Sequence, residues 1–337
     1  STVNQKISNR ILKTIKKNKF ILSNEVSMFE KEFSNFCNAK YTVGCANGYD
    51  ALFLSLKVLD LDKNSEVIVP AMTYAATAYA VINSGLKLKL VDVDKNGLLD
   101  LNKLEKKINK KTKAIIPVHL YGQPVNMKKL INIKKKYNLK IIEDCAEAHG
   151  VEYKGKKVGS IGDIGAFSFF ANKTITCGEG GMVVTNSKKL AEKASSLKNL
   201  SYGKINKFMH EDIGFNYRLP NISAALGLGQ LENINNIIKE KEKIYLRYKN
   251  NLQNIKGINI PKIRDWVTKY IMWVFNIYLD EKFSITRDQL VKELQKENIE
   301  TRNAFVPVNK QKILINKYNL FDENECPNAN YIMDNGL

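Results

Sequence analysis

Between residues 162 and 181 the chain reads Gly162-Asp163-Ile164-Gly165-Ala166-Phe167-Ser168-Phe169-Phe170-Ala171-Asn172-Lys173, and shortly afterwards Gly178-Glu179-Gly180-Gly181. Lys173 is the only charged residue between Asp163 and Glu179. Apolar and aromatic residues precede it, so its ammonium should have little water around it. Its pKa should therefore fall and its amine become a nucleophile that forms a Schiff base with an aldehyde. A solvated loop lysine is the alternative interpretation.

A second segment, Lys140-Ile141-Ile142-Glu143-Asp144-Cys145-Ala146-Glu147, ends a β-branched run in acidic and small residues. It predicts a buried parallel strand that delivers Asp144 at its carboxyl end, where open α/β sheets place their ligands. A carboxylate there can keep a pyridine nitrogen protonated, which turns the ring into an electron sink. A helix cap or turn is the alternative role for Asp144. The presence of Lys173 favours the electron sink.

Helical and strand patterns alternate along the chain, which predicts a doubly wound α/β fold. We expect strands at 66–69, 87–91, 114–117, 140–143, 165–169 and 182–185, with helices at 30–37, 49–59, 75–84, 127–137, 187–200 and 222–252. A domain boundary is expected near residue 257. Beyond it we expect a strand at 274–279 and a helix at 286–297 with Thr286 as its cap.

Composition fits a large enzyme rather than a nucleic-acid or membrane protein. The chain has 337 residues, enough for a large domain plus a smaller one. We expect no membrane span and no signal peptide, because no apolar run is long enough. The five scattered cysteines predict reduced thiols in the cytoplasm. The net charge of +19 is spread over solvated helix faces without a nucleic-acid motif, so we expect no nucleic-acid partner.

Several ordered motifs resemble the sugar aminotransferases of the DegT/DnrJ/EryC1/StrS family. The resemblance runs over most of the chain and is densest from Ala46 to Gln230. Besides the two segments above, it is carried by Asn47-Gly48-Tyr49-Asp50-Ala51-Leu52, Val69-Pro70-Ala71-Met72-Thr73-Tyr74 and Gly214-Phe215-Asn216-Tyr217-Arg218.

The resemblance implies the aspartate aminotransferase-like fold of fold type I pyridoxal-phosphate enzymes. It implies a large cofactor-binding domain (1–256, including the amino-terminal segment) with a mostly parallel seven-stranded sheet. A small carboxyl-terminal α+β domain (257–337) would follow, incomplete relative to the family. It also implies a homodimer, or a higher oligomer, with shared active sites.

The same resemblance assigns roles to individual residues. Lys173 would hold pyridoxal 5'-phosphate as an internal aldimine and release it in the pyridoxamine phosphate half-reaction, while Asp144 keeps the ring nitrogen protonated. The remaining cofactor-binding residues would be Gly48, Tyr49, Tyr74, Glu147, Ser168 and Asn216, the last from the neighbouring subunit. Tyr49 stands where the family usually has threonine, and Glu147 where many members have glutamine near the ring hydroxyl. No metal is expected.

The implied reaction moves an amino group from L-glutamate to a nucleotide-diphosphate keto sugar. The segment from Phe169 to Met182 is most similar to the members of the family that make GDP-perosamine, so GDP-4-keto-6-deoxymannose is the expected substrate, for surface polysaccharide (O-antigen, lipopolysaccharide) synthesis. Aminotransferases of UDP- or dTDP-linked keto sugars remain alternatives. Related sugar dehydratases carry histidine at the lysine position, and Lys173 argues against that reaction.

Overall fold

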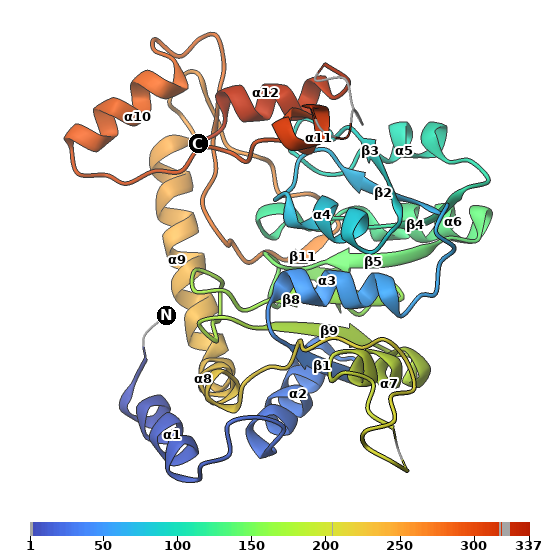
Figure 1. The fold of residues 1–337 in the computed structure, drawn as a ribbon. Helices are drawn as coiled ribbons and strands as arrows, with labels where there is room; N and C mark the ends of the chain where they lie inside the picture. The colour runs from blue at the N-terminus through green and yellow to red at the C-terminus, as the bar shows by residue number, and fades with distance from the viewer. Residues whose placement is uncertain (1–2, 204, 317, 319–323) are drawn as a thin grey trace.

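The computed structural model describes residues 3–203, 205–316, 318 and 324–337, and its centre is a seven-stranded sheet (Figure 1). In sheet order the strands are β1 (Tyr41–Cys45), β9 (Gly181–Thr185), β8 (Ile164–Ser168), β5 (Lys140–Asp144), β4 (Thr112–Ile115), β2 (Glu66–Pro70) and β3 (Lys87–Val91). β9 pairs antiparallel with β1 and β8, and the other pairs are parallel. The prediction of a mostly parallel seven-stranded sheet is confirmed.

Helices cover both faces of this sheet, because successive strand residues point to opposite sides. In β2, Val67 and Val69 belong to one apolar cluster and Ile68 to another. The first cluster includes residues of α3 (Gly48–Lys57), α4 (Ala76–Asn83) and α7 (Lys188–Leu197). The second includes residues of α2 (Asn24–Cys37), α5 (Leu101–Lys107), α6 (Met127–Tyr137) and α8 (Asn221–Glu232). The result is a three-layer α/β/α arrangement.

An aromatic core explains the phenylalanines that precede Lys173. Phe29 and Phe33 of α2 are fully buried and meet Phe169, with ring centroids 5.0 and 5.1 Å apart respectively. Phe33 also packs edge-on against Phe167 at 5.0 Å. These rings fix the end of β8, so the segment that carries the lysine leaves the sheet from a rigid base.

The remaining elements lie around this core. α1 (Gln5–Lys16) packs against α8 at one end, and α9 (Ile234–Leu252) leads towards the elements drawn in orange and red (Figure 1). These include β10 (Ile258–Asn259) and β12 (Tyr278–Leu279), which pair with each other, together with α10 (Arg287–Lys296), η2 (Val308–Lys310), α11 (Lys312–Asn316) and α12 (Pro327–Asn335). β11 (Val267–Lys269) returns to the hairpin of β6 (Glu152–Tyr153) and β7 (Lys156–Lys157), while η1 (Leu120–Gly122) follows β4. The division into domains at residue 257 stays a prediction.

Two expected elements differ in the structure. The helix predicted over 222–252 is broken at Asn233, whose backbone (φ −102°, ψ 9°) is not helical, and α9 begins afresh at Ile234. The strand predicted over 274–279 is reduced to Tyr278–Leu279, because the residues before it turn towards the lysine hairpin, where the Trp273 indole donates to Asn172 O. The cap at Thr286 is confirmed, since its side chain and Gln289 form a reciprocal capping box.

All five cysteines are unpaired and buried. They are distributed over distant parts of the fold, namely Cys37, Cys45, Cys145, Cys177 and Cys326. In the described part of the chain, no helix combines the length and the apolar character needed to cross a bilayer.

Candidate active site

Lys173 lies in the hairpin that joins β8 to β9. The Phe169 N–H donates to Gly180 O (2.8 Å) and the Cys177 N–H donates to Phe169 O (2.9 Å), which closes the hairpin. β8 is also the parallel neighbour of β5, whose last residue is Asp144. Asp144 and Lys173 therefore lie at or just beyond the carboxyl ends of two adjacent parallel strands, where such sheets place their ligands.

The side chain of Lys173 is partly buried, and its amine lies against an aromatic ring. Its Nζ lies 3.8 Å from the centroid of the Trp273 ring. Burial lowers the pKa of Lys173, and the nearby carboxylates of Glu147 and Asp144 oppose that effect. A lysine with a lowered pKa offers more of its free amine near neutrality, which is the form that attacks an aldehyde or removes a proton.

Asp144 is buried but well supported. Its Oδ2 accepts a hydrogen bond from the Thr77 hydroxyl (2.8 Å), and its Oδ1 accepts one from the Ala146 N–H (3.1 Å). Burial nevertheless raises the pKa of Asp144, with these hydrogen bonds and the charge of Lys173 acting in the opposite direction. A buried carboxyl group whose pKa is raised favours a cationic partner, such as a protonated pyridine nitrogen, which would stabilise its ionised form.

Glu147 faces the same site from the turn after β5. Its Oε2 accepts a hydrogen bond from the Tyr121 N–H (2.8 Å), and burial raises its pKa to about 7 although Lys173 opposes the shift. The side chain is therefore close to half-protonated near neutrality. A carboxyl group in that state can donate a hydrogen bond as well as accept one, as a glutamine amide would.

The amino terminus of α3 forms a cradle with the end of β8. Asn47 caps the helix by accepting from the Asp50 N–H (2.8 Å), and the N–H groups of Gly48 and Tyr49 open the first turn. A Cβ added to Gly48 would lie 2.5 Å from the Ser168 Cβ, so the backbone approaches Ser168 more closely than any other residue would allow. Backbone donors, a hydroxyl and a helix amino end suit a phosphate group.

The side chain of Tyr49 does not add to this cradle. Its hydroxyl accepts a hydrogen bond from Asn83 Nδ2 of α4 (2.5 Å), and its ring stacks near Phe53 with centroids 6.4 Å apart. The large aromatic side chain is accommodated between two helices. At this position the backbone N–H remains as the donor to an anion.

Trp273, which contacts the Lys173 amine, belongs to a cluster of four aromatic rings. Tyr74, after the end of β2, has 64% of its surface exposed and lies 5.8 Å from the Phe305 ring. Phe305 stacks on Tyr121 (5.9 Å) and near Trp273 (6.4 Å), and Tyr121 stacks near Trp273 (6.3 Å). An exposed aromatic ring at the edge of this cluster, which Trp273 joins to the partly buried Lys173, is a suitable surface for a flat ligand.

Asn216 is the predicted site residue that the structure does not join to the others. It is exposed, and its backbone pairs with Asn199. The next residue, Tyr217, accepts the Ala46 N–H (3.1 Å) just before α3. Among the described residues, no hydrogen bond links the Asn216 side chain to Lys173 or Ser168. The sequence analysis gives this asparagine to the neighbouring subunit, and that assignment stays a prediction.

The sequence analysis missed Thr77, Trp273 and Phe305. Thr77 had a local signal, because it follows Tyr74 within the first turn of α4, where a hydroxyl can reach the end of a neighbouring strand. Trp273, which contacts Lys173, and Phe305, which stacks near Trp273, had none, since both lie more than ninety residues further along the chain.

His149 lies beneath the lysine hairpin as a packed residue. Its ring is fully buried and lies 5.5 Å from each of the Phe167 and Phe169 rings. Burial, and secondarily the charge of Lys173, lower its pKa to about 3. The imidazole is therefore neutral at physiological pH.

A second buried group contains His119, Glu143 and Cys145, whose ligand atoms lie within 4.8 Å of one another. His119 Nδ1 accepts from the Val125 N–H (3.2 Å), so its proton is on Nε2 and is donated to Glu143 (3.0 Å). Glu143 also accepts backbone N–H groups, from Gly159 at 3.0 Å, Ile161 at 2.8 Å and Gly162 at 2.6 Å. These bonds use the lone pairs that a metal would need, and they fix the backbone on either side of Asp144.

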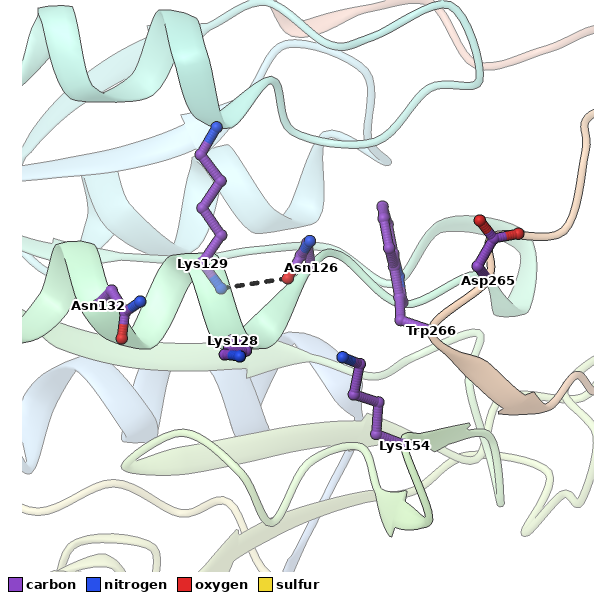
Figure 2. Close-up of a pocket in the computed structure, with 7 residues that line it drawn as sticks. All are labelled: Asn126, Lys128, Lys129, Asn132, Lys154, Asp265 and Trp266. Carbon is purple, nitrogen blue, oxygen red and sulfur yellow. Dashed lines mark hydrogen bonds between the residues drawn. The ribbon is translucent and has the colours of Figure 1, made fainter.

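A separate surface pocket of about 370 Å³ lies beside α6 and shares no residue with the lysine site (Figure 2). It is lined by Asn126, Lys128, Lys129, Asn132, Lys154, Asp265 and Trp266. The Trp266 indole donates to Pro124 O (2.9 Å), so the ring is held upright between Asn126 and Asp265 (Figure 2).

Known proteins resemble the chain over most of its length. The profile of the DegT/DnrJ/EryC1/StrS aminotransferase family matches residues 1–337. A GDP-perosamine synthase of Caulobacter vibrioides is 42% identical over 282 residues, which cover 83% of this chain and 76% of that protein. A dTDP-3-amino-3,6-dideoxy-alpha-D-galactopyranose transaminase of Aneurinibacillus thermoaerophilus is 38% identical over 314 residues, 91% of this chain and 82% of that protein.

The fold also matches solved structures over nearly the whole chain. The S. venezuelae protein DesV, crystallised with a ketimine intermediate, superposes with a TM-score of 0.91 at 31% identity, covering 98% of this chain and 87% of that one. The mostly parallel sheet and this likeness confirm the predicted α/β fold class of fold type I aminotransferases. The chain belongs to the DegT/DnrJ/EryC1/StrS aminotransferase family.

Proposed function

We propose that this chain is a pyridoxal-phosphate-dependent aminotransferase that moves the amino group of L-glutamate to C4 of GDP-4-keto-6-deoxymannose, which yields GDP-perosamine. The placement of a water-shielded Lys173 amine beside the buried Asp144 carboxyl carries the reaction class. The GDP-linked substrate is supported by the 42% identical Caulobacter relative.

The residues present fit the cofactor. Because residue 48 is a glycine, the start of α3 can come close to Ser168. The Ser168 hydroxyl and the backbone N–H groups of Gly48 and Tyr49 would together bind the phosphate of the cofactor. Asp144 would hold the ring nitrogen, Tyr74 would stack on the ring, and Glu147 would lie beside it. When bound, pyridoxal phosphate would supply an aldehyde that carries the amino group and a ring that stores an electron pair.

The chain's own groups would then move protons and hold charge. Lys173, with its lowered pKa, would remove the proton from the α-carbon of glutamate and later deliver one to C4 of the sugar. Asp144 would keep its partner nitrogen protonated in both directions, because loss of that proton would leave the carboxylate buried without a counter-charge. The aromatic rings around Lys173 would exclude water from the reacting atoms.

We further propose a homodimer in which Asn216 of the partner subunit completes each phosphate site. The segment before Asn216 supports this, because it exposes large apolar side chains that a second copy could cover, namely Ile205, Phe208, Met209 and Ile213. Mixing two inactive variants, Lys173→Ala and Asn216→Ala, should restore activity, since a mixed dimer contains one intact site. No recovery in a sample with proven subunit exchange would refute shared sites.

A cytoplasmic location is part of the proposal. It is supported by the five unpaired cysteines, which suit a reducing compartment.

The deciding experiment is an absorption spectrum of the protein with pyridoxal phosphate, before and after addition of glutamate. The wild type should gain a visible band that glutamate bleaches, and Lys173→Ala should not. Lys154→Ala, which removes an exposed lysine of the distant pocket, is the matched control and should behave as wild type. A wild type without a band would refute the aminotransferase proposal.

Substrate choice is tested separately, with GDP-, dTDP- and UDP-linked 4-keto sugars and mass spectrometry of the product. A dTDP-linked substrate is the second candidate, supported by the 38% identical Aneurinibacillus relative. Faster amination of the dTDP- or UDP-linked sugar would replace GDP in the proposal and leave the reaction class intact.

A further inference from the structure

Trp273 reaches the lysine hairpin from a distant part of the chain. It lies in the connection between β11 and β12, and its indole Nε1 donates a hydrogen bond to Asn172 O (2.9 Å). Its ring centroid lies 3.8 Å from Lys173 Nζ, within the range of a cation–π contact. One side chain therefore contacts both the backbone that carries the lysine and the amine itself.

The indole ring is held in place from several directions. Lys241 of α9 donates from Nζ to Trp273 O (3.0 Å), which anchors the backbone. The ring stacks near Tyr121 at 6.3 Å with an interplanar angle of 18°, and near Phe305 at 6.4 Å and 27°. A ring with this many fixed neighbours is preorganised, so its contact with the amine costs little side-chain entropy.

The proposed reaction needs Lys173 to be released from the cofactor and to return to it. A free lysine has a flexible four-carbon side chain, and here the carboxyl groups of Asp144 and Glu147 also attract it. We propose that Trp273 is a positioning residue for Lys173: its indole face holds the released amine over the site while its N–H fixes the hairpin backbone at Asn172. The inference rests on the proposed function for its role in turnover, whereas the contact itself does not depend on the substrate.

Removal of the indole should change the titration of Lys173. In Trp273→Leu an apolar side chain still covers the amine, so most of its desolvation is retained while the cation–π contact, which stabilises only the ammonium, is lost. The pKa of Lys173 should therefore fall by about one pH unit. The acidic groups that face the amine, Asp144 and Glu147, are unchanged in such variants, and so are His149 beneath the hairpin and Lys241 behind the indole. If Trp273 only shields the amine from water, its replacement should instead raise the pKa of Lys173 or leave it unchanged.

The first test measures acylation of Lys173 against pH in the full chain freed of cofactor, by mass spectrometry of its peptide. Trp273→Leu should shift the profile by about one pH unit towards acid, and Trp273→Phe, which keeps an aromatic face, by less. Trp266→Phe removes the other tryptophan of the chain, which stands in the separate pocket (Figure 2), and should leave the profile unchanged. Coincident profiles for all four proteins, or a shift towards alkaline pH in Trp273→Leu, would overturn the proposal.

A second test keeps Trp273 and so does not depend on whether its variants fold. In Trp266→Phe protein, Trp273 is the sole tryptophan, and its fluorescence should titrate together with the acylation profile of Lys173. The transition should vanish when Lys173→Met is added. Fluorescence that titrates identically without Lys173 would overturn the contact. If both tests succeed in a protein without aminotransferase activity, the contact stands and the proposed function fails.

Discussion

Glu147→Gln is the substitution whose effect on stability is most directly calculated from the structure. The change removes a buried ionisable group but keeps an oxygen that can accept the Tyr121 N–H, now 2.8 Å from Oε2. Burial raises the pKa of Glu147 from 4.5 to about 7 in the folded chain. The folded state therefore binds a proton between these pH values that the unfolded state has already released.

The sign follows from this difference in proton binding. Stability from the protonated carboxyl is fully present below the unfolded pKa and declines as the pH rises to about 7, above which it is constant. Each pH unit corresponds to about 1.4 kcal/mol, so the wild type should lose about 3 kcal/mol over this window relative to the glutamine variant.

The assay is urea unfolding of both proteins, without cofactor, from about pH 5 to about pH 8, with the difference between their unfolding free energies plotted against pH. Glu242→Gln, an exposed carboxylate on α9, is the control and should give a flat difference. If the wild type and Glu147→Gln curves run parallel, burial does not hold the proton on Glu147 and the reasoning is wrong.

Three further changes test the supports of the site. Gly48→Ala should abolish the visible cofactor band, because its Cβ would lie 2.5 Å from the Ser168 Cβ; a normal spectrum would contradict the cradle. Thr77→Val should cost about 1.5–3 kcal/mol in urea unfolding, because Asp144 loses its hydroxyl donor, and an unchanged midpoint would show that this bond contributes nothing. Glu143→Gln should lower the unfolding free energy by about 3 kcal/mol or more, because an amide NH₂ would face backbone donors; a smaller loss would mean that the network rearranges.

Features set by local sequence were predicted well. The alternation of strand and helix patterns predicted the order of the elements. Thr286 predicted the start of α10, because a helix cap depends only on neighbouring residues. Lys173 and Asp144 could be proposed from the sequence, because Lys173 interrupts an uncharged stretch and Asp144 ends a β-branched run, and a charge in such a position needs a reason.

Features set by long-range packing were not predictable in this way. Nothing near Trp273 in the sequence indicates that it lies over Lys173, because the contact depends on how β11 rejoins the β6–β7 hairpin. The break at Asn233 was missed because the apolar period continues across it, although asparagine competes locally with helical hydrogen bonds. The direction of the Tyr49 side chain, whose hydroxyl bonds to Asn83 of α4, also depends on a neighbouring helix and could not be predicted from the local sequence.

Because every cysteine is buried, reaction of a thiol with a labelling reagent would report local opening of the fold around it. Burial raises the pKa of each thiol, that of Cys326 to about 12, and only the thiolate form attacks an alkylating reagent. The closed molecule should therefore resist labelling. Reaction at Cys45 would report detachment of β1 from the sheet edge, and reaction at Cys326 would report loosening ahead of α12. A new cysteine placed on the surface would be labelled alone, so a probe can be attached without removing any native thiol.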